Sequence, residues 1–280
     1  MIKIGEYNIL RVIKEVDFGI YLDGGEAGEI LMPKQYVPKD TKPNDDLYAF
    51  IYLDSEDRLL ATTLKPYVTV GSFAYLQVLH VDKVGAFLYW GLPKDLFVPF
   101  GEQKQDMKAG EWYVVYVYHD KKTNRIAAST KLDKFIDIGE PDLNQGDEVD
   151  LLVYQQTDLG YKAIVNNKYS GLLYDNELFK PVKPGDRLIA YVKQIRPDFK
   201  IDLILRKSTG TENIDSVASA ILDRINSAGG FMAIGDKTSA DEIYNLFGVS
   251  KKVFKKAIGN LYRHRLITID DDGLRNLSGD

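Results

Sequence analysis

The stretch that decides the fold is VDFGIYL at Val16–Leu22, in which Gly19 separates two runs of strand-forming residues. Markers recur around it in a fixed frame: Gly5, Gly71 and Gly146 come first, Gly19, Gly85 and Gly160 follow at one spacing, and Asn44, Gly110 and Gly185 follow at a second. Both spacings are identical in every copy, so the markers of one copy align with those of the next without a gap. Such a constant register predicts three copies of one structural unit.

Each copy reads as five short β-strands. In the first copy we expect them at Tyr7–Val16, Gly19–Leu22, Gly28–Met32, Asp46–Leu53 and Leu59–Thr63. These runs are rich in Val, Ile, Leu and Tyr, and Gly, Pro, Asn and Asp separate them. Five short strands with a long connection between the third and the fourth are typical of the OB barrel. The sequence therefore predicts a mainly β chain with five-stranded OB-fold barrels over residues 1–66, 67–139 and 140–207.

Helical spacing replaces the strand pattern in the last part of the chain. A first helix carries Val217, Ala220, Ile221, Leu222 and Ile225 on one face and ends at Gly229-Gly230. Ser239 is the expected N-cap of a second helix, which Gly248 ends, and Ser250 is the expected N-cap of a third. A two-stranded wing follows, with its turn at residues 270–273. This order predicts a small α+β winged-helix domain over residues 213–280.

Several segments carry a resemblance to a known family. In the first copy they are Val16–Leu22, Gly28–Ile30, Lys42–Asp45 and Asp54–Arg58; in the second, Val84–Leu88, Lys108–Glu111 and Asp120; in the third, more weakly, Gly146–Val149, Leu159–Gly160 and Lys183–Asp186. They resemble the S-one RNA-binding domain, the repeat of the largest protein of the small ribosomal subunit. The whole chain is similar to conserved virulence factor B, a bacterial family of three such barrels and a winged helix. Gly28–Lys34 and Trp90–Leu96 carry that second resemblance.

The resemblance to the S-one domain implies a binding surface of aromatic rings around the strand-two glycine, with an Asp and an Arg at the fourth turn. Matching positions are Phe18, Tyr21, Asp54 and Arg58 in the first copy, Phe87, Asp120 and Arg125 in the second, and Leu159 and Lys162 in the third. Val84 replaces the first aromatic of the second copy, and no copy has the strand-three histidine of the family. Bases stack on such rings while cations follow the backbone of the strand.

The same residues have an ordinary structural interpretation. Aromatic side chains are common in strands because they pack well there. Strand alternation places Phe18 and Tyr21 on opposite sides unless the chain twists or bulges at Gly19. Near a turn, Arg58 and Arg125 can simply be solvated charges, and Asp54 and Asp120 can be turn carboxylates.

A second cluster of cations lies on the expected third helix. It comprises Lys251, Lys252, Lys255, Lys256, Arg263 and Arg265, with no acidic residue between Val249 and Ile269. We expect Lys252, Lys255, Lys256 and Arg263 to contact phosphates, because counterion release favours such contacts. The alternative is a solvated helix face. The three aspartates of the wing turn would repel a nucleic-acid backbone, so the helix rather than the wing is the expected contact.

Composition limits the possible functions. The 280 residues are 45% hydrophobic and 28% charged, which is typical of a globular protein. Since there is no cysteine, disulfides, thiolate metal sites and thiol nucleophiles are excluded, and a reducing cytoplasm is the expected location. Three dispersed histidines and no phosphate-binding glycine motif predict no catalytic residue, no metal and no cofactor. Neither a secretory signal nor a membrane-spanning apolar run is expected.

These observations predict a non-catalytic RNA-binding protein that grips single-stranded or loop RNA by base stacking and phosphate contacts. The family resemblance implies a role in regulating bacterial gene expression. Two alternatives remain open. The net charge of −5 and the acidic first copy favour a protein-docking scaffold on the ribosome or the transcription machinery. The winged helix favours a regulator that binds DNA.

Overall fold

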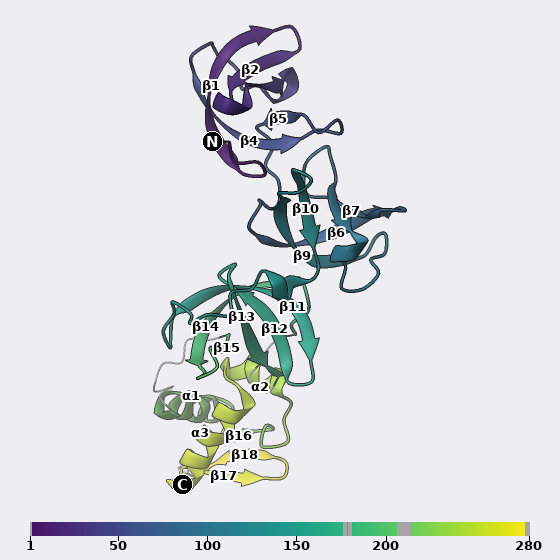
Figure 1. The fold of residues 1–280 in the computed structure, drawn as a ribbon. Helices are drawn as coiled ribbons and strands as arrows, with labels where there is room; N and C mark the ends of the chain where they lie inside the picture. The colour runs from purple at the N-terminus through teal and green to yellow at the C-terminus, as the bar shows by residue number, and fades with distance from the viewer. Residues whose placement is uncertain (1, 176–177, 179–180, 206–213, 278–280) are drawn as a thin grey trace. The chain divides into compact units, whose positions relative to one another are not determined.

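The computed structural model describes residues 2–175, 178, 181–205 and 214–277 (Figure 1). Within these residues the chain forms three closed five-stranded barrels, followed by three α-helices and a three-stranded sheet. It divides into two compact units, Met1–Asp137 and Ile138–Asp280. The predicted fold class is therefore confirmed. The expected boundary at residues 207–213 and the last three residues of the expected winged helix lie outside the described residues.

The first barrel has the strand order β1-β2-β3-β5-β4. Its strands are β1 (Tyr7–Val16), β2 (Gly19–Asp23), β3 (Glu29–Pro33), β4 (Asp46–Leu53) and β5 (Leu59–Thr62). Because side chains alternate along a strand, Ile20, Leu22, Ile30 and Met32 fill the barrel interior while Tyr21 and Leu31 lie on its outside. This alternation gives each strand one face in the barrel core and one face on the outer surface of the barrel.

The repeated strand-two glycine marks the closest approach of two strands. Gly19 has φ +156°, and a Cβ there would lie 2.1 Å from the carbonyl oxygen of Met32. Gly85 and Gly160 would meet the carbonyl oxygens of Val98 and Leu173 at 2.3 and 2.0 Å. Any side chain at these positions would push the second strand away from the third, so the barrel requires glycine in every copy.

The second barrel shares a hydrophobic core with the first. Its strands are β6 (Phe73–Val81), β7 (Gly85–Leu88), β8 (Leu96–Pro99), β9 (Trp112–Asp120) and β10 (Arg125–Ser129). Trp90, in the connection between β7 and β8, packs edge-on against Phe50 of β4 with ring centroids 5.9 Å apart. Its indole N–H donates to the carbonyl oxygen of Lys94 at 2.6 Å. The segment Trp90–Leu96 therefore contributes to the joint between the first two barrels, where Trp90, Leu92 and Leu96 share a core with Phe50 and Tyr52.

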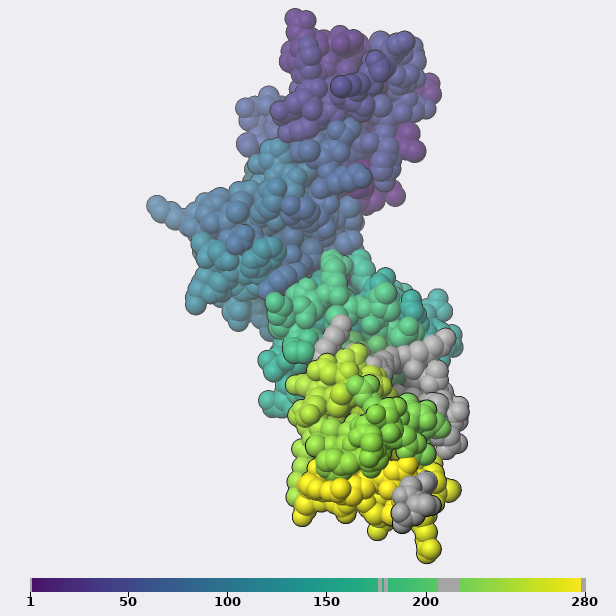
Figure 2. Space-filling view, turned by 180° about the vertical axis from the view of Figure 1, so that it is seen from behind, coloured from purple at the N-terminus to yellow at the C-terminus, as the bar shows by residue number. Residues whose placement is uncertain are grey.

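The second unit contains the third barrel and the helices, which adjoin each other in both views (Figure 1, Figure 2). The barrel strands are β11 (Glu148–Thr157), β12 (Gly160–Val165), β13 (Tyr169–Tyr174), β14 (Arg187–Ile195) and β15 (Ile201–Ile204). The remaining elements are α1 (Ile214–Ser227), β16 (Phe231–Met232), α2 (Ala240–Phe247), α3 (Lys251–Arg263), β17 (Ile267–Asp270) and β18 (Gly273–Asn276). The barrel and the helices have separate cores.

The helix caps are confirmed, and two details are corrected. Ser239 and Ser250 accept hydrogen bonds from the backbone N–H groups of residues 242 and 253, at 3.1 and 3.4 Å. The predicted two-stranded wing is a three-stranded sheet, because β16, too short to show alternation, pairs with β18. Ala220 is exposed and Ala218 is buried instead, since residues 218, 221 and 225 follow the helical period more closely.

Candidate nucleic-acid interface

Phe18 and Tyr21 lie on one surface of the first barrel. Phe18 occupies the two-residue turn between β1 and β2, where it is 58% exposed, so strand alternation does not apply to it. Its ring meets the half-buried ring of Tyr21 edge-on, with centroids 6.3 Å apart. The ammonium group of Lys14 lies 4.8 Å from the centroid of the Tyr21 ring and pairs with Glu29 at 2.6 Å. The two rings and Lys14 form an exposed aromatic and cationic surface.

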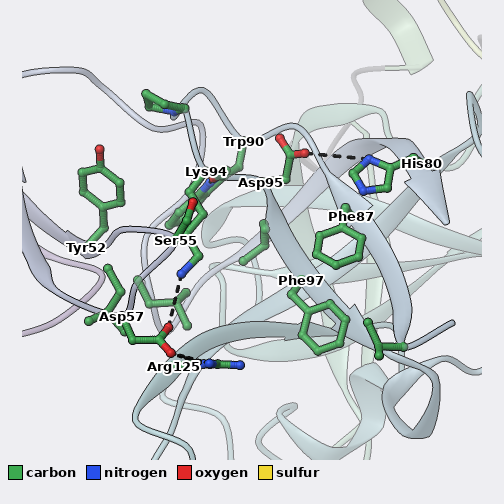
Figure 3. Close-up of a pocket in the computed structure, with 15 residues that line it drawn as sticks. Tyr52, Ser55, Asp57, His80, Phe87, Trp90, Lys94, Asp95, Phe97 and Arg125 are labelled. Atoms are coloured by element: carbon green, nitrogen blue, oxygen red, sulfur yellow. Dashed lines mark hydrogen bonds and ion pairs between the residues drawn. The ribbon is translucent and has the colours of Figure 1, made fainter. Parts of the chain in front are cut away.

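Phe87 lies in the middle of a column of three rings on the second barrel (Figure 3). The ring of His80 stacks on it at 4.6 Å and within 9° of parallel, and the ring of Phe97 lies 5.1 Å away. His80, Phe87 and Phe97 are direct neighbours across β6, β7 and β8. Sequence reasoning missed His80 and Phe97, because only the pairing register of the three strands places them beside Phe87. We refer to these three residues as the aromatic column.

A pocket of about 600 Å³ opens beside the aromatic column, within the first unit. The turn between β4 and β5 of the first barrel forms one wall through Ser55 and Asp57, together with Tyr52 at the end of β4. The second barrel supplies the rest, including the column, Lys94 and Arg125. Figure 3 shows Lys94 and Arg125 both directed toward Asp57. The pocket therefore combines ring surfaces with charged groups from two barrels.

Carboxylates already hold the two arginines expected at phosphates. Arg125 donates to Asp57 of the other barrel through Nε at 3.1 Å and through Nη2. The hydrogen bond from Arg125 and its positive charge hold the pKa of Asp57 below its usual value. Arg58 is bound at 2.7 Å by Asp54 and at 3.0 Å by Glu56. Neither arginine is thus an unpaired cation in the protein alone.

Asp54 and Asp120 act as turn carboxylates. Asp54 accepts backbone N–H groups of residues 56 and 58 at 2.8 and 2.9 Å. Asp120 accepts the backbone N–H of Lys122 at 3.0 Å and the Thr123 hydroxyl at 2.8 Å. These hydrogen bonds stabilise the tight turns that connect the fourth strand to the fifth.

The equivalent face of the third barrel is polar. Lys162 is exposed on β12 and pairs across the strands with Leu172, which pairs in turn with Asp202. Asp202 is only 3% exposed and accepts hydrogen bonds from the Tyr174 hydroxyl at 3.2 Å, from Gln194 at 2.6 Å and from Arg196 at 3.1 Å. No ring column forms on this face of the described barrel.

The cations of α3 lie opposite its buried side. Lys252, Lys255, Lys256 and Arg263 are exposed, whereas Phe254, Ala257, Ile258 and Leu261 are buried. Lys255 lies 3.6 Å from Asp236. Basic side chains partly neutralise the acidic wing turn: Lys237 binds Asp271 at 2.8 Å and Arg275 binds Asp272 at 2.6 Å. The helix therefore presents the positive surface of this domain.

The described residues contain no group of three His, Cys, Asp or Glu side chains placed to hold a metal ion. None of the described helices is both long and apolar enough to cross a membrane.

A model of the S1 domain matches residues 4–64 and again residues 70–131, and a model of the CvfB-like winged helix domain matches residues 219–275. This chain combines S1 domains with a CvfB-like winged helix domain. Both S1 matches fall on the first unit, which carries Phe18, Tyr21 and the aromatic column. S1 and winged helix domains are typically binding domains, and neither matched model indicates an enzyme family.

Relatives span nearly the whole chain. The uncharacterized protein YitL of Bacillus subtilis is 27% identical over 274 residues, which cover 93% of this chain and 89% of YitL. Conserved virulence factor B of Staphylococcus epidermidis is 24% identical over 282 residues, covering 95% of this chain and 92% of the relative. A solved structure of a multidomain protein with nucleic acid binding domains from Streptococcus pneumoniae is 25% identical and covers 98% of both chains, with a TM-score of 0.43. The predicted resemblance to conserved virulence factor B is confirmed.

Proposed function

We propose that this protein binds single-stranded RNA through its first two S1 domains and regulates bacterial gene expression in the cytoplasm without catalysing a reaction. One observation carries the proposal. The aromatic column on β6, β7 and β8 of the second barrel lies next to a pocket lined by two cationic side chains, Lys94 and Arg125.

The physics of single-strand binding accounts for such a surface. Each base that stacks on an exposed ring contributes on the order of 1–3 kcal/mol, nearly independent of its identity. Sequence preference should therefore be weak. The intramolecular stack covers part of Phe87, so we expect bases on the outer rings, His80 and Phe97, and on Phe18 and Tyr21 of the first barrel. Two barrels joined in one unit raise the overall affinity because the second contact becomes intramolecular.

The winged helix domain gives a second contact in this proposal. The exposed cations of α3 would bind the RNA backbone through phosphates, with little information about sequence. The same surface favours a second candidate function, a regulator that binds duplex DNA, because a winged helix presents its third helix to the major groove.

A protein-docking scaffold is the other candidate. The outer face of β1 and β4 in the first barrel exposes Ile9 and Tyr48, which are paired across the strands. This surface is apolar and lies on strands other than those that carry Phe18 and Tyr21.

Binding of the purified chain to labelled homopolymer RNA and to duplex DNA tests the proposal, with salt raised from about 50 to about 300 mM. We expect RNA binding that weakens steeply with salt and falls when Tyr21 or Phe87 is changed to alanine, because Tyr21 is a stacking ring and Phe87 holds the two outer rings of the column in place. Tyr48→Ala is the matched control, because Tyr48 is an exposed aromatic outside the proposed surface, and it should bind as the unaltered chain does. Tighter binding of duplex DNA would favour the DNA regulator, and absence of binding at every salt concentration would favour the scaffold.

A further inference from the structure

Asp57 of the first barrel forms ion pairs with two cations of the second barrel, Lys94 and Arg125. Asp57 lies at the tip of the turn between β4 and β5, and its carboxylate accepts hydrogen bonds from Arg125 and lies 3.5 Å from the ammonium of Lys94. Lys94 also donates to the backbone carbonyl of Asp54. All three side chains line the pocket beside the aromatic column.

We infer that this pocket takes one nucleotide of a bound RNA strand, whose phosphate replaces the carboxylate of Asp57 on Arg125 and Lys94. The inference rests on the proposed function and adds to it a site formed by both barrels. In the protein alone, the carboxylate of Asp57 takes the place of the RNA phosphate on Arg125 and Lys94. A carboxylate and a phosphate make the same charge-assisted hydrogen bonds to a guanidinium, and Arg binds either in a bidentate way.

The walls of the pocket match the parts of a nucleotide. Phe97, an outer ring of the column, lies on one side, where a base can stack on it, and Phe87 supports it from behind. Ser55 carries a hydroxyl group on the wall from the first barrel, where it can donate to or accept from the sugar or the base edge. About 600 Å³ is in the range of ordinary small-molecule pockets and can hold a single nucleotide.

The carboxylate is free to leave. The side chains of Asp57 and Arg125 are 38% and 58% exposed, and ion pairs as exposed as this contribute little to folding stability. The turn around Asp57 is held by the hydrogen bonds of Asp54, so releasing the Asp57 side chain need not disturb it. The joint between the barrels also keeps its apolar contact between Trp90 and Phe50.

If Asp57 competes with the strand, removing its charge should tighten RNA binding. Asp57→Asn is the test variant because Asp57 has φ +62°, a left-handed conformation that asparagine tolerates well. Glu56→Gln is the matched control: it removes the same charge from the neighbouring residue of the same turn, but Glu56 pairs with Arg58, which Asp54 continues to hold at 2.7 Å in the variant.

The experiment measures binding of labelled single-stranded RNA to the full chain across a salt series. We expect Asp57→Asn to bind about threefold to tenfold more tightly, with a salt dependence steeper by about 0.7 for each added phosphate contact. Glu56→Gln should stay within about twofold of the unaltered chain, since it frees no cation of the pocket. Thermal unfolding checks that both variants are folded.

A double variant locates the effect. In an Arg125→Gln background, Asp57→Asn should gain less affinity than in the unaltered chain, because Lys94 is then the one cation of the pair that it can release. Free adenosine monophosphate as a competitor separates a strand from a free nucleotide. We expect no displacement of RNA at about 1 mM, since one nucleotide lacks the contacts of the rest of the strand.

The outcomes are distinguishable. If the unaltered chain binds RNA but Asp57→Asn binds no better, or Glu56→Gln gains as much, the composite site is wrong and the proposed function stands. Displacement of RNA by adenosine monophosphate at about 1 mM or below would overturn the assignment of the pocket to a strand. If neither the unaltered chain nor Asp57→Asn binds RNA, the proposed function itself fails.

Discussion

The second and third barrels have the same glycine frame and the same five-strand connectivity, yet the side chains on their outer faces differ in chemical character. Across the second, third and fifth strands, the second barrel places Phe87, Phe97 and Ala127 in one row. The third barrel places Lys162, Leu172 and Asp202 in the equivalent row. The barrel fold needs only its inward positions and its glycine, so the outward row is free to become an aromatic surface in one copy and a hydrogen-bonded network in another.

The largest expected effect tests whether this row binds RNA. Phe97→Ala should weaken RNA binding about tenfold or more, because it removes an outer ring on which a base can stack. The matched variant in the third barrel, Leu172→Ala, should change RNA affinity by less than about twofold. Fluorescence anisotropy with a labelled homopolymer measures both. Equal losses in the two variants would mean that the outer rows do not differ in function.

The second prediction concerns stability in the third barrel. Asp202→Ala should lower the free energy of unfolding by about 2–3 kcal/mol, because it removes the acceptor of three side-chain hydrogen bonds in a buried position. Chemical denaturation measures this loss, and RNA affinity should stay unchanged. A loss of RNA binding in a folded variant would show that the network, too, belongs to a binding surface.

The same network predicts a pH dependence. Burial raises the pKa of Asp202, but the hydrogen bonds from Arg196 and Gln194 lower it by more, so the pKa of Asp202 lies below its usual value. A depressed pKa contributes stability above the unfolded value of about 3.9, and that contribution is lost as the pH falls through the folded value. The stability difference between the unaltered chain and Asp202→Asn should therefore shrink as the pH falls below about 4. A difference that is constant with pH would contradict the assignment.

A gain-of-function variant sharpens the comparison. Lys162→Phe combined with Leu172→Phe copies the pair of the second barrel onto the third, and we expect it to raise RNA affinity about threefold to fivefold. Lys162→Leu with Leu172→Phe is the control, because it removes the same charge and provides one ring only. If both variants bind alike, the rings need more than the strand row to form a binding surface.

The smallest expected effect lies on α3. Lys256→Ala should weaken RNA binding about twofold to threefold and reduce the salt slope by about 0.7. Lys255→Ala should do less, since Lys255 is already near Asp236. A salt titration of both variants measures the difference, and equal slopes for both variants and the unaltered chain would remove α3 from the interface.

Much of the fold could be predicted from local signals. The glycine frame predicted the barrels because the backbone of each copy leaves no room for a Cβ at Gly19, Gly85 or Gly160. Ser239 and Ser250 cap their helices as expected because capping involves only neighbouring residues.

The candidate site was harder to predict from the sequence than the fold. Phe87 was named, but His80 and Phe97 were not. A bulge in β6 between Val78 and His80 sets the register that places His80 beside Phe87, and the pairing of β7 with β8 places Phe97 there.

The sequence by itself determined where the strands of the first barrel and the three helices form and where cations gather on α3, because these follow from side-chain periodicity and short-range sterics. Only the tertiary structure decided that Trp90 packs on Phe50, that Asp57 of one barrel holds Arg125 of the next and that a pocket opens there. Those contacts join residues far apart in the chain. They depend on how two closed surfaces meet, and no local pattern records that.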